Sequence, residues 1–508
     1  MKRTKRCLTK WAAMIFAVTI AIACSPASRA EDQPAATQPA ASQPATTSQP
    51  TATAQPAATA QPTADQRLEE LEKQVTLLQE EIAALKTDVT PGIKTAALTE
   101  PAAGGSSAIG GSLNSSPSAD DAPPKISIAS LLGPVTLSGF GDVYYGYDPN
   151  HPFNNMAGLR SFESPTNGFN FNMAELILDK APDATSPESR LGYHVSAGYG
   201  YAAKIINGTD NTGFDPSDSN FFLKEAYVSY LAPIGKGLTF TVGKFVTPMG
   251  AEVIESNANW NYSRGLLFDY AIPFFHFGAN AKYAFNPKWA VTGYLVNGWN
   301  NTIINHDSTF GASSGLTYGV SLAYTPNMKW SATENYFAGP VTDAFGLGGQ
   351  TLNDWKQISD TVIGYTPNSK WAFQINGDYG FGPRFYTGTC AEGGPPACTA
   401  GPAVDWWGVA AYAKYTWSPK TNFAFRYEYF DDPQGYEGLT DFERGWAQEF
   451  TGTYSYNLTS ALLIRGEYRY DFASLPIFDE SFSNEKAVKQ QNTATVSFVY
   501  TFSSANLK

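Results

Sequence analysis

Charged side chains are scarce in this sequence, at 16% of its 508 residues, whereas aromatic side chains make up 14%. Long apolar runs are scarce too. After residue 23 no stretch of about 18 residues is continuously apolar, which excludes a transmembrane helix from the rest of the chain. Such a composition is unusual for a soluble enzyme. A chain that crosses a membrane without helices must form a closed β-barrel, because only closure satisfies every backbone group in lipid.

Catalytic and metal-binding motifs are also missing. The four histidines are scattered, and neither an HExxH nor a GxSxG motif occurs: the histidines are His151, His194, His276 and His306. His276 is the one candidate for a catalytic histidine on a barrel wall, and an interfacial or interior position is the favoured interpretation. The Asp-rich segment 207–220 lacks the ordered spacing of a calcium loop and reads as a solvated surface loop. We therefore predict no enzymatic activity, no cofactor and no metal site.

Cysteines number only four, and two of them lie close together as Cys390 and Cys398 in CAEGGPPAC. In an exported protein this spacing predicts a disulfide that closes a small surface loop, with two free thiols as the alternative. The formal net charge is −12, and removal of the six basic residues up to Arg29 leaves −18. So acidic a chain is not expected to bind nucleic acid.

The N-terminal region predicts export. Five basic residues precede an apolar run from Trp11 to Ala23, and a small residue, Ala30, suits cleavage. A membrane anchor and lipoprotein cleavage at Cys24 remain alternatives to an ordinary signal peptide. The predicted organisation is a signal peptide at 1–30, an Ala/Gln/Pro/Thr spacer at 31–64, a coiled-coil helix at 65–90, a flexible linker at 91–133 and a β-barrel at 134–508.

The predicted helix at 65–90 carries an apolar seam with alternating spacings of three and four: Leu68, Leu71, Val75, Leu78, Ile82, Leu85 and Val89. Nothing in the neighbouring sequence offers a surface for this seam. Self-association is therefore the favoured interpretation, and docking on another part of the same chain is the alternative.

A short phrase recurs about forty residues apart, as YTPNMKW at 324–330 and YTPNSKW at 365–371. Each copy places Pro and Asn, which favour turns, between aromatic residues. A repeat of this length predicts two strands, one long loop and one short turn.

Alternation of side chains supports this interpretation. In 462–472, apolar and aromatic residues share one face, while Arg465, Glu467 and Arg469 share the other; in 423–429, Arg426 and Glu428 likewise oppose aromatic residues. An all-β chain of about sixteen strands is predicted, near 134–146, 168–180, 190–201, 221–231, 236–246, 272–285, 288–299, 316–325, 329–339, 354–366, 370–381, 404–417, 420–431, 444–456, 460–472 and 489–502. Glu334 falls on the same face as Trp330, which predicts a bulge or a position near the lipid headgroups.

A soluble β-sandwich would show the same alternation. The connections favour a membrane barrel, because short turns at one end and long loops at the other are typical of outer-membrane barrels. Aromatic residues beside the turns would form an interfacial girdle: Trp289, Tyr324, Trp330, Tyr365, Trp371, Tyr415 and Trp417. The sequence therefore predicts the bacterial outer membrane, with outer-membrane lipid around the barrel and the N-terminal segment in the periplasm.

Three phrases resemble a known family: LKEAYVSY at 223–230, GLTFTVGKFVTPMGAEVIES at 237–256 and YSRGLLF at 262–268. They are similar to the OmpL-like β-barrel porins, and the similarity spans much of the barrel from about Leu137 onward. The resemblance implies an outer-membrane channel. It names no solute, and a trimer of the heptad helix would suit such a porin.

The longest predicted loop, at about 246–271, is the candidate constriction, because the third loop of general porins folds into the lumen. Charges of both signs would lie there and sort solutes: Lys244, Glu252, Glu255, Arg264 and Asp269. An ion pair between Arg264 and Glu252 that holds the loop to the wall is the alternative. The expected lumen-facing residues are Arg426, Glu428, Arg465, Glu467 and Arg469, which could instead pair across neighbouring strands.

Two functions follow as expectations. The first is a porin for passive diffusion of small hydrophilic solutes or ions through a water-filled barrel, as a homo-oligomer with a trimer favoured. The second is a structural envelope anchor that links the outer membrane to the cell wall or to partners through the N-terminal coiled coil.

Overall fold

The computed structural model describes residue 133 and residues 135–208, 219–304, 313–341, 354–387, 399–439, 444–480 and 487–504. Several predictions fall outside these residues: the signal peptide, the spacer, the coiled-coil helix, nearly all of the linker, the Cys390–Cys398 disulfide and most of the Asp-rich segment. Within the described residues, no helix is both long and apolar enough to span a bilayer.

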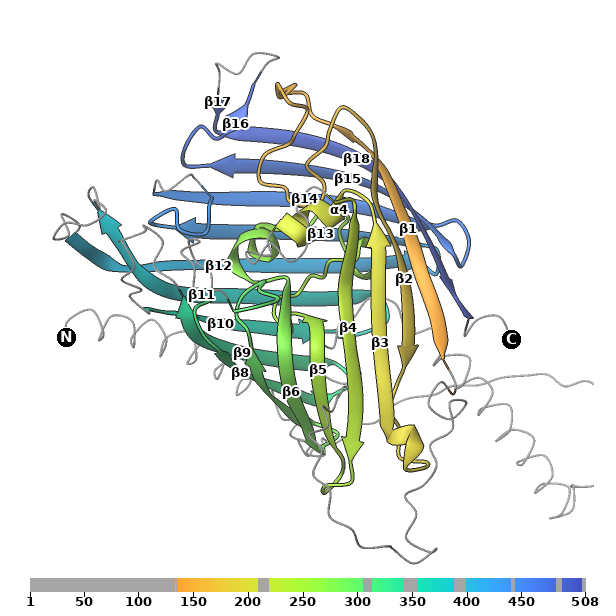
Figure 1. Cartoon of the computed structure of the whole chain (residues 1–508). Coiled ribbons are helices and arrows are strands. Elements are labelled where there is room, and N and C mark those ends of the chain that lie inside the picture. Colours follow the sequence, from red (N-terminus) through yellow and green to blue (C-terminus); the bar gives the residue numbers. More distant parts are fainter. Residues whose placement is uncertain are drawn as a thin grey trace, which may run out of the picture. The chain divides into compact units, whose positions relative to one another are not determined.

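Sixteen strands form one closed antiparallel barrel, in which consecutive strands pair and β1 pairs with β18 to complete the ring (Figure 1). They are β1 (Thr136–Tyr147), β2 (Gly168–Lys180), β3 (Leu191–Tyr199), β4 (Phe221–Ala232), β5 (Leu238–Val246), β6 (Phe275–Asn286), β7 (Trp289–Val296), β8 (Thr317–Asn327), β9 (Trp330–Val341), β10 (Asp354–Tyr365), β11 (Trp371–Thr387), β12 (Thr399–Ser418), β13 (Thr421–Asp432), β14 (Gly445–Asn457), β15 (Leu462–Ala473) and β18 (Gln490–Ser503). The predicted fold class and strand number are confirmed.

Shorter elements lie in the connections. A separate two-stranded ribbon, β16 (Phe478–Asp479) and β17 (Ala487–Val488), belongs to the chain segment that connects β15 to β18. The helical segments are η1 (Glu188–Arg190), α4 (Ala202–Gly208), η2 (Ser256–Ala258) and η3 (Leu267–Ala271).

The repeated phrase forms tight hairpin turns. The side-chain oxygen of Asn368 accepts hydrogen bonds from the backbone N–H of Lys370 (2.9 Å) and of Trp371 (3.1 Å), which fixes the reversal between β10 and β11. Beside the preceding turn, the rings of Trp330 and Tyr365 stack across neighbouring strands with centroids 4.2 Å apart. The phrase therefore supplies both the polar turn and the aromatic pair at its edge.

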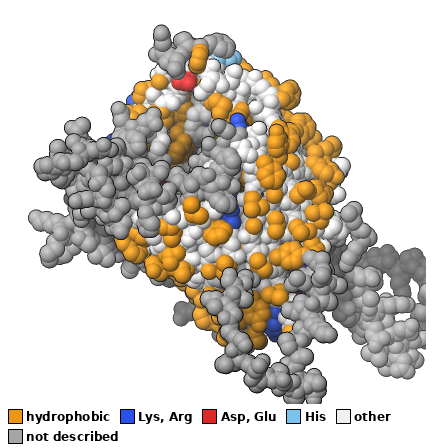
Figure 2. All heavy atoms as spheres, viewed as in Figure 1, with side chains coloured by type: hydrophobic (Ala, Val, Ile, Leu, Met, Phe, Trp, Pro, Cys, Tyr) orange, Lys and Arg blue, Asp and Glu red, His pale blue; other side chains and the backbone are white. Residues whose placement is uncertain are grey.

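The two faces of the wall differ as the alternation predicts. On β13, Phe425 is 55% exposed on the outer face, whereas its neighbour Arg426 is 2% exposed on the inner face. Apolar side chains cover much of the outer face in Figure 2. Such a face suits hydrocarbon, and a polar interior suits water and solutes.

Glu334 has local partners on the outer face of the wall. The pairing of β9 with β10 runs without a register shift from Trp330↔Tyr365 to Val341↔Asp354, whereas the pairing of β8 with β9 shifts between Tyr324 and Asn327, opposite Trp330 and Ala332. An irregularity therefore lies beside Trp330, while the pairing of Glu334 itself, about 13 Å further along the strand, is regular. The hydroxyls of Ser359 and Thr361 donate hydrogen bonds to the Glu334 carboxylate.

We predict that Gly380→Ala destabilises the barrel. A Cβ at Gly380 would lie 1.9 Å from Cε2 of the buried Trp406, so the indole would have to move. Overpacking of this kind costs about 1–3 kcal/mol, and a lower thermal unfolding midpoint in detergent should report it. Gly466→Ala is the matched control, because a Cβ there meets no atom within 4 Å. Equal midpoints for the two variants would contradict this packing.

Candidate functional site

The connection from β5 to β6, residues 247–274, turns into the barrel, and we term it the inner loop. Gly250 has a φ of +85°, a conformation that favours glycine, where the chain leaves the end of β5. The Gly250 N–H donates to Asp360 Oδ2 on β10 (3.1 Å), and the Ala251 N–H donates to Asn376 Oδ1 on β11 (2.9 Å). The inner loop therefore begins by binding the inner face of β10 and β11.

The same loop also reaches β1. The Ser256 hydroxyl donates to Asp142 Oδ2 (2.7 Å), and the Tyr262 hydroxyl donates to Asp142 Oδ1 (2.9 Å). In the ring of strands, β1 and β10 lie nearly opposite each other. The inner loop thus crosses the interior of the barrel, and Figure 1 shows this green segment within the ring of strands.

Arg426 binds the inner loop to β13 and β14. Its Nη1 donates to Glu252 Oε1 (2.5 Å) and to the Ser263 carbonyl (2.5 Å), while its Nε donates to Glu449 Oε1 on β14 (2.6 Å). The guanidinium is buried, so it is shielded from solvent screening. Loss of one partner from such a buried pair typically costs about 3–5 kcal/mol, because the other charge is left uncompensated.

Carboxylates of the wall and of the loop bind backbone N–H groups. Glu467 on β15 accepts from the N–H of Tyr262 (2.6 Å) and of Ser263 (3.0 Å), and Glu252 accepts from the N–H of Gly265 (2.6 Å). A Cβ at Gly265 would lie 2.1 Å from Oε1 of Glu428, so a side chain there would displace this carboxylate. The loop's backbone donors are therefore satisfied by charged acceptors, which form stronger bonds than neutral ones.

The arginines of β15 bind loop carbonyls. Arg465 donates to the carbonyls of Ser256 (2.6 Å) and Asn259 (2.7 Å), and Arg469 donates to that of Arg264 (2.5 Å). Each guanidinium bridges elements that lie far apart in the sequence.

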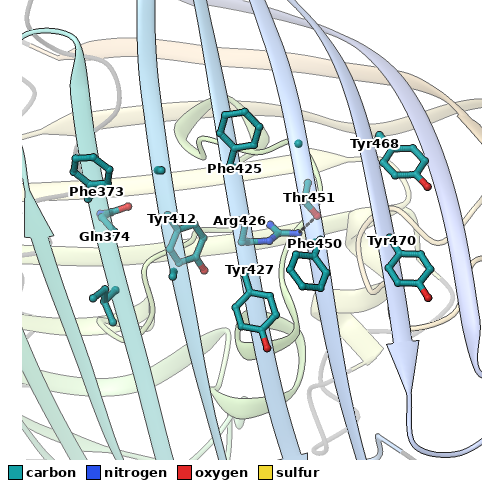
Figure 3. Close-up of a pocket in the computed structure, with 14 residues that line it drawn as sticks. Phe373, Gln374, Tyr412, Phe425, Arg426, Tyr427, Phe450, Thr451, Tyr468 and Tyr470 are labelled. Carbon is teal, nitrogen blue, oxygen red and sulfur yellow. Dashed lines mark hydrogen bonds between the residues drawn. The ribbon is translucent and has the colours of Figure 1, made fainter.

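Figure 3 shows the outer side of the same wall. The rings of Phe425, Tyr427 and Phe450 stand on the outer face, while Arg426 extends on the other face toward Thr451. These rings also line a recess of about 560 Å³ in the outer face over β11–β15. One strand thus supplies lipid-facing rings and loop-binding charges.

A second connection, residues 148–167 between β1 and β2, packs against the inner loop. Arg160 pairs with Asp471 on β15 (2.8 Å), Glu163 pairs with Arg264, and the Ser161 N–H donates to Asp269 (3.1 Å). Burial raises the pKa of Glu163 to about 7 even though the Arg264 guanidinium opposes the shift. Burial likewise raises the pKa of Asp269 to about 6.

Of the predicted constriction residues, Glu252, Arg264 and Asp269 lie in this buried network. The alternative ion pair between Arg264 and Glu252 is wrong in its partners, because Arg264 pairs with Glu163 and Glu252 pairs with Arg426. Arg264 also donates to the Ile254 carbonyl within the loop, and all three residues are almost fully buried.

The other two constriction residues lie elsewhere. Glu255 pairs with the buried Lys224 on β4, and 21% of its side chain stays exposed. Lys244 on β5 is buried with its Nζ 4.3 Å from the centre of the Phe275 ring.

The five residues expected to face the lumen are all on the inner face and almost fully buried: Arg426, Glu428, Arg465, Glu467 and Arg469. They contact the inner loop or its partners, as well as neighbouring strands. Sequence reasoning missed Glu449, whose place in an alternating strand could have indicated it. It also missed Glu163, for which the sequence offers no signal.

His276 is engaged on both ring nitrogens. Nδ1 lies 2.9 Å from the Gly298 carbonyl, Nε2 lies 3.3 Å from the Thr247 hydroxyl, and the ring stacks on Phe337. The described residues contain no group of three or more His, Cys, Asp or Glu side chains that could hold a metal ion.

A closed antiparallel barrel with an apolar outer face and a polar interior defines the class of outer-membrane β-barrel channels. The chain belongs to the family described as "Putative beta-barrel porin-2, OmpL-like", which matches residues 134–502. The resemblance seen in the sequence is therefore confirmed. The protein is a porin of the outer membrane, and its family is one of channels rather than enzymes.

Solved structures similar to this chain include an outer-membrane channel, a porin and an outer-membrane protein. The channel DcaP of Acinetobacter baumannii shares 12% identity at a TM-score of 0.48, covering 72% of this chain and 97% of its own. The anion-selective porin from Comamonas acidovorans shares 11% identity at a TM-score of 0.47, covering 73% and 99%. OmpT of Vibrio cholerae shares 10% identity at a TM-score of 0.45, covering 72% and 97%. No curated protein matches the chain.

The packing of the two loops should weaken as the pH rises. A carboxyl whose folded pKa of about 7 exceeds its usual 4.5 binds more protons in the folded state, so the free energy of unfolding falls between about pH 4.5 and 7. Glu163→Gln should flatten this fall, by at most about 3 kcal/mol. Thermal unfolding in detergent from pH 4.5 to 8 measures it, with Glu188→Gln in η1 as the control. The same pH slope in wild type and Glu163→Gln would contradict the assignment.

Proposed function

We propose that this porin lets small hydrophilic solutes and ions diffuse passively across the outer membrane, and that the inner loop narrows the passage. The observation that carries the proposal is that the loop binds Asp360 on β10 and Asp142 on β1, at nearly opposite points of the ring. A loop held at both ends divides the interior, and solutes must pass beside it.

The charged residues are assigned different parts in this proposal. Glu252, Arg264 and Asp269, which are buried, set the position of the loop rather than meeting the solute. Glu255 is the loop carboxylate that meets solutes, since part of its side chain stays exposed beside Lys224. Lys244 supports the return of the loop into β6 through its contact with Phe275. The lumen-facing set, Arg426, Glu428, Arg465, Glu467 and Arg469, binds the loop to the wall.

The lipid around the barrel follows from the apolar outer face of the wall, which outer-membrane lipid covers. The N-terminal segment lies in the periplasm. The heptad seam at 65–90 supports a homo-oligomer, with a trimer favoured. The same seam is the observation that favours the second candidate, a structural anchor joined to the cell wall or to partners.

Single-channel recording in planar bilayers separates the two functions. The full chain and a variant lacking residues 31–124 should both give stepwise currents of the same size, because the passage belongs to the barrel. A barrel that inserts but stays closed would overturn the porin proposal and favour the anchor. Folding of each sample should be checked first, by the shift of the unheated protein on an electrophoresis gel.

A further inference from the structure

A strip of polar side chains interrupts the apolar outer face at β9 and β10. It consists of Glu334 and Tyr336 on β9 with Gln357, Ser359 and Thr361 on β10, and we term it the outer strip. Its place on the outer face follows from the register, since paired residues share a face. Glu334 pairs with Leu322 and Tyr336 pairs with Val320, and both partners are exposed apolar residues of β8.

The outer strip lies midway between two aromatic levels. Four residues before Glu334, Trp330 stacks on Tyr365 at the short-turn end. Four residues after it, Ala338 pairs with Tyr318, whose ring stacks on Trp355 toward the long-loop end. Each interval is about 13 Å along the strand, so Glu334 lies at mid-depth of the hydrocarbon region.

The strip contains hydroxyl donors and a strong acceptor. The Ser359 and Thr361 hydroxyls donate to the Glu334 carboxylate, and the Tyr336 hydroxyl donates to Gln357. A carboxylate offers about four acceptor positions, and two donors leave part of that capacity open. Lipid chains offer no donor, so ionisable groups at this depth normally meet protein or water.

We infer that the outer strip is a contact surface for a second copy of this chain. The inference rests on the proposed homo-oligomer and names its surface within the membrane. Two features favour a copy over another protein. The three hydroxyls donate within the strip, but the strip also carries the amide N–H donors of Gln357 and the acceptor oxygens of Glu334, so the same groups on a copy can complement it where the strips meet at the symmetry axis. The heptad seam at 65–90, only some forty-five residues before β1, would hold copies side by side.

Small residues around the strip allow close approach. Ala332 and Ala338 flank the pair Glu334 and Tyr336 on the outer face of β9, and Gly377 on β11 pairs with Thr361 on β10. By contrast, the outer recess over β11–β15 is walled by rings such as Phe425 and Phe450, which suits lipid chains. The two outer regions therefore provide a test position and a control position on one molecule.

Photocrosslinking of the full chain in outer membranes tests the inference. A benzophenone amino acid is placed by Ala332→benzoylphenylalanine beside the strip or by Ala413→benzoylphenylalanine on the outer face of β12. We expect the Ala332 variant to give a crosslinked species of twice the chain mass. The Ala413 variant should give no such species. Crosslinks to lipid only, or to a protein of another mass, would overturn the inference.

Side-chain variants give a second readout. Glu334→Leu should abolish the Ala332 crosslink, whereas Glu334→Gln, which retains acceptor and donor groups, should keep it. If the wild type runs as an oligomer but Ala332 gives no crosslink, copies meet elsewhere and only the strip assignment fails. If the wild type is a monomer by native mass spectrometry, the proposed homo-oligomer fails as well. In either case the channel currents of the barrel remain a separate test of the porin.

Discussion

A buried guanidinium that must be paired is the constraint on which the interior of this barrel depends. Arg426 lies on the inner face of β13 and is almost fully removed from solvent, so its charge requires close acceptors. Glu449 on the wall supplies one acceptor, and Glu252 with the Ser263 carbonyl in the inner loop supplies the others. The loop cannot leave without taking the Glu252 and Ser263 acceptors from this buried charge, and the passage is therefore shaped by electrostatics as much as by strand number.

The outer face obeys the opposite rule, because hydrocarbon accepts no unpaired polar group. Rings and branched side chains satisfy that rule over most strands, and the repeated YTPN turns mark the edge with stacked Trp and Tyr. Glu334 is an exception, and two hydroxyls on β10 donate to its carboxylate. Both faces thus follow one requirement, that polar groups in a medium of low dielectric find partners.

The strands could be predicted because a period of two and a recurring turn are local signals. Predicted β2 and observed β2 coincide at 168–180, and other boundaries differ by a few residues, with β11 and β12 longer than expected. The pairing of Arg264 with Glu163 could not be predicted, since 101 residues separate them and neither lies in a periodic segment.

Single-channel recording of Arg426→Gln tests whether this network holds the inner loop across the passage. We expect a changed conductance with frequent transitions between levels, because Glu252 and Ser263 lose their shared donor. Arg190→Gln, at the opposite end of the wall from the loop and bonded to the Leu231 carbonyl, should leave the currents unchanged. A folded Arg426→Gln barrel with the steady conductance of the wild type would contradict the account.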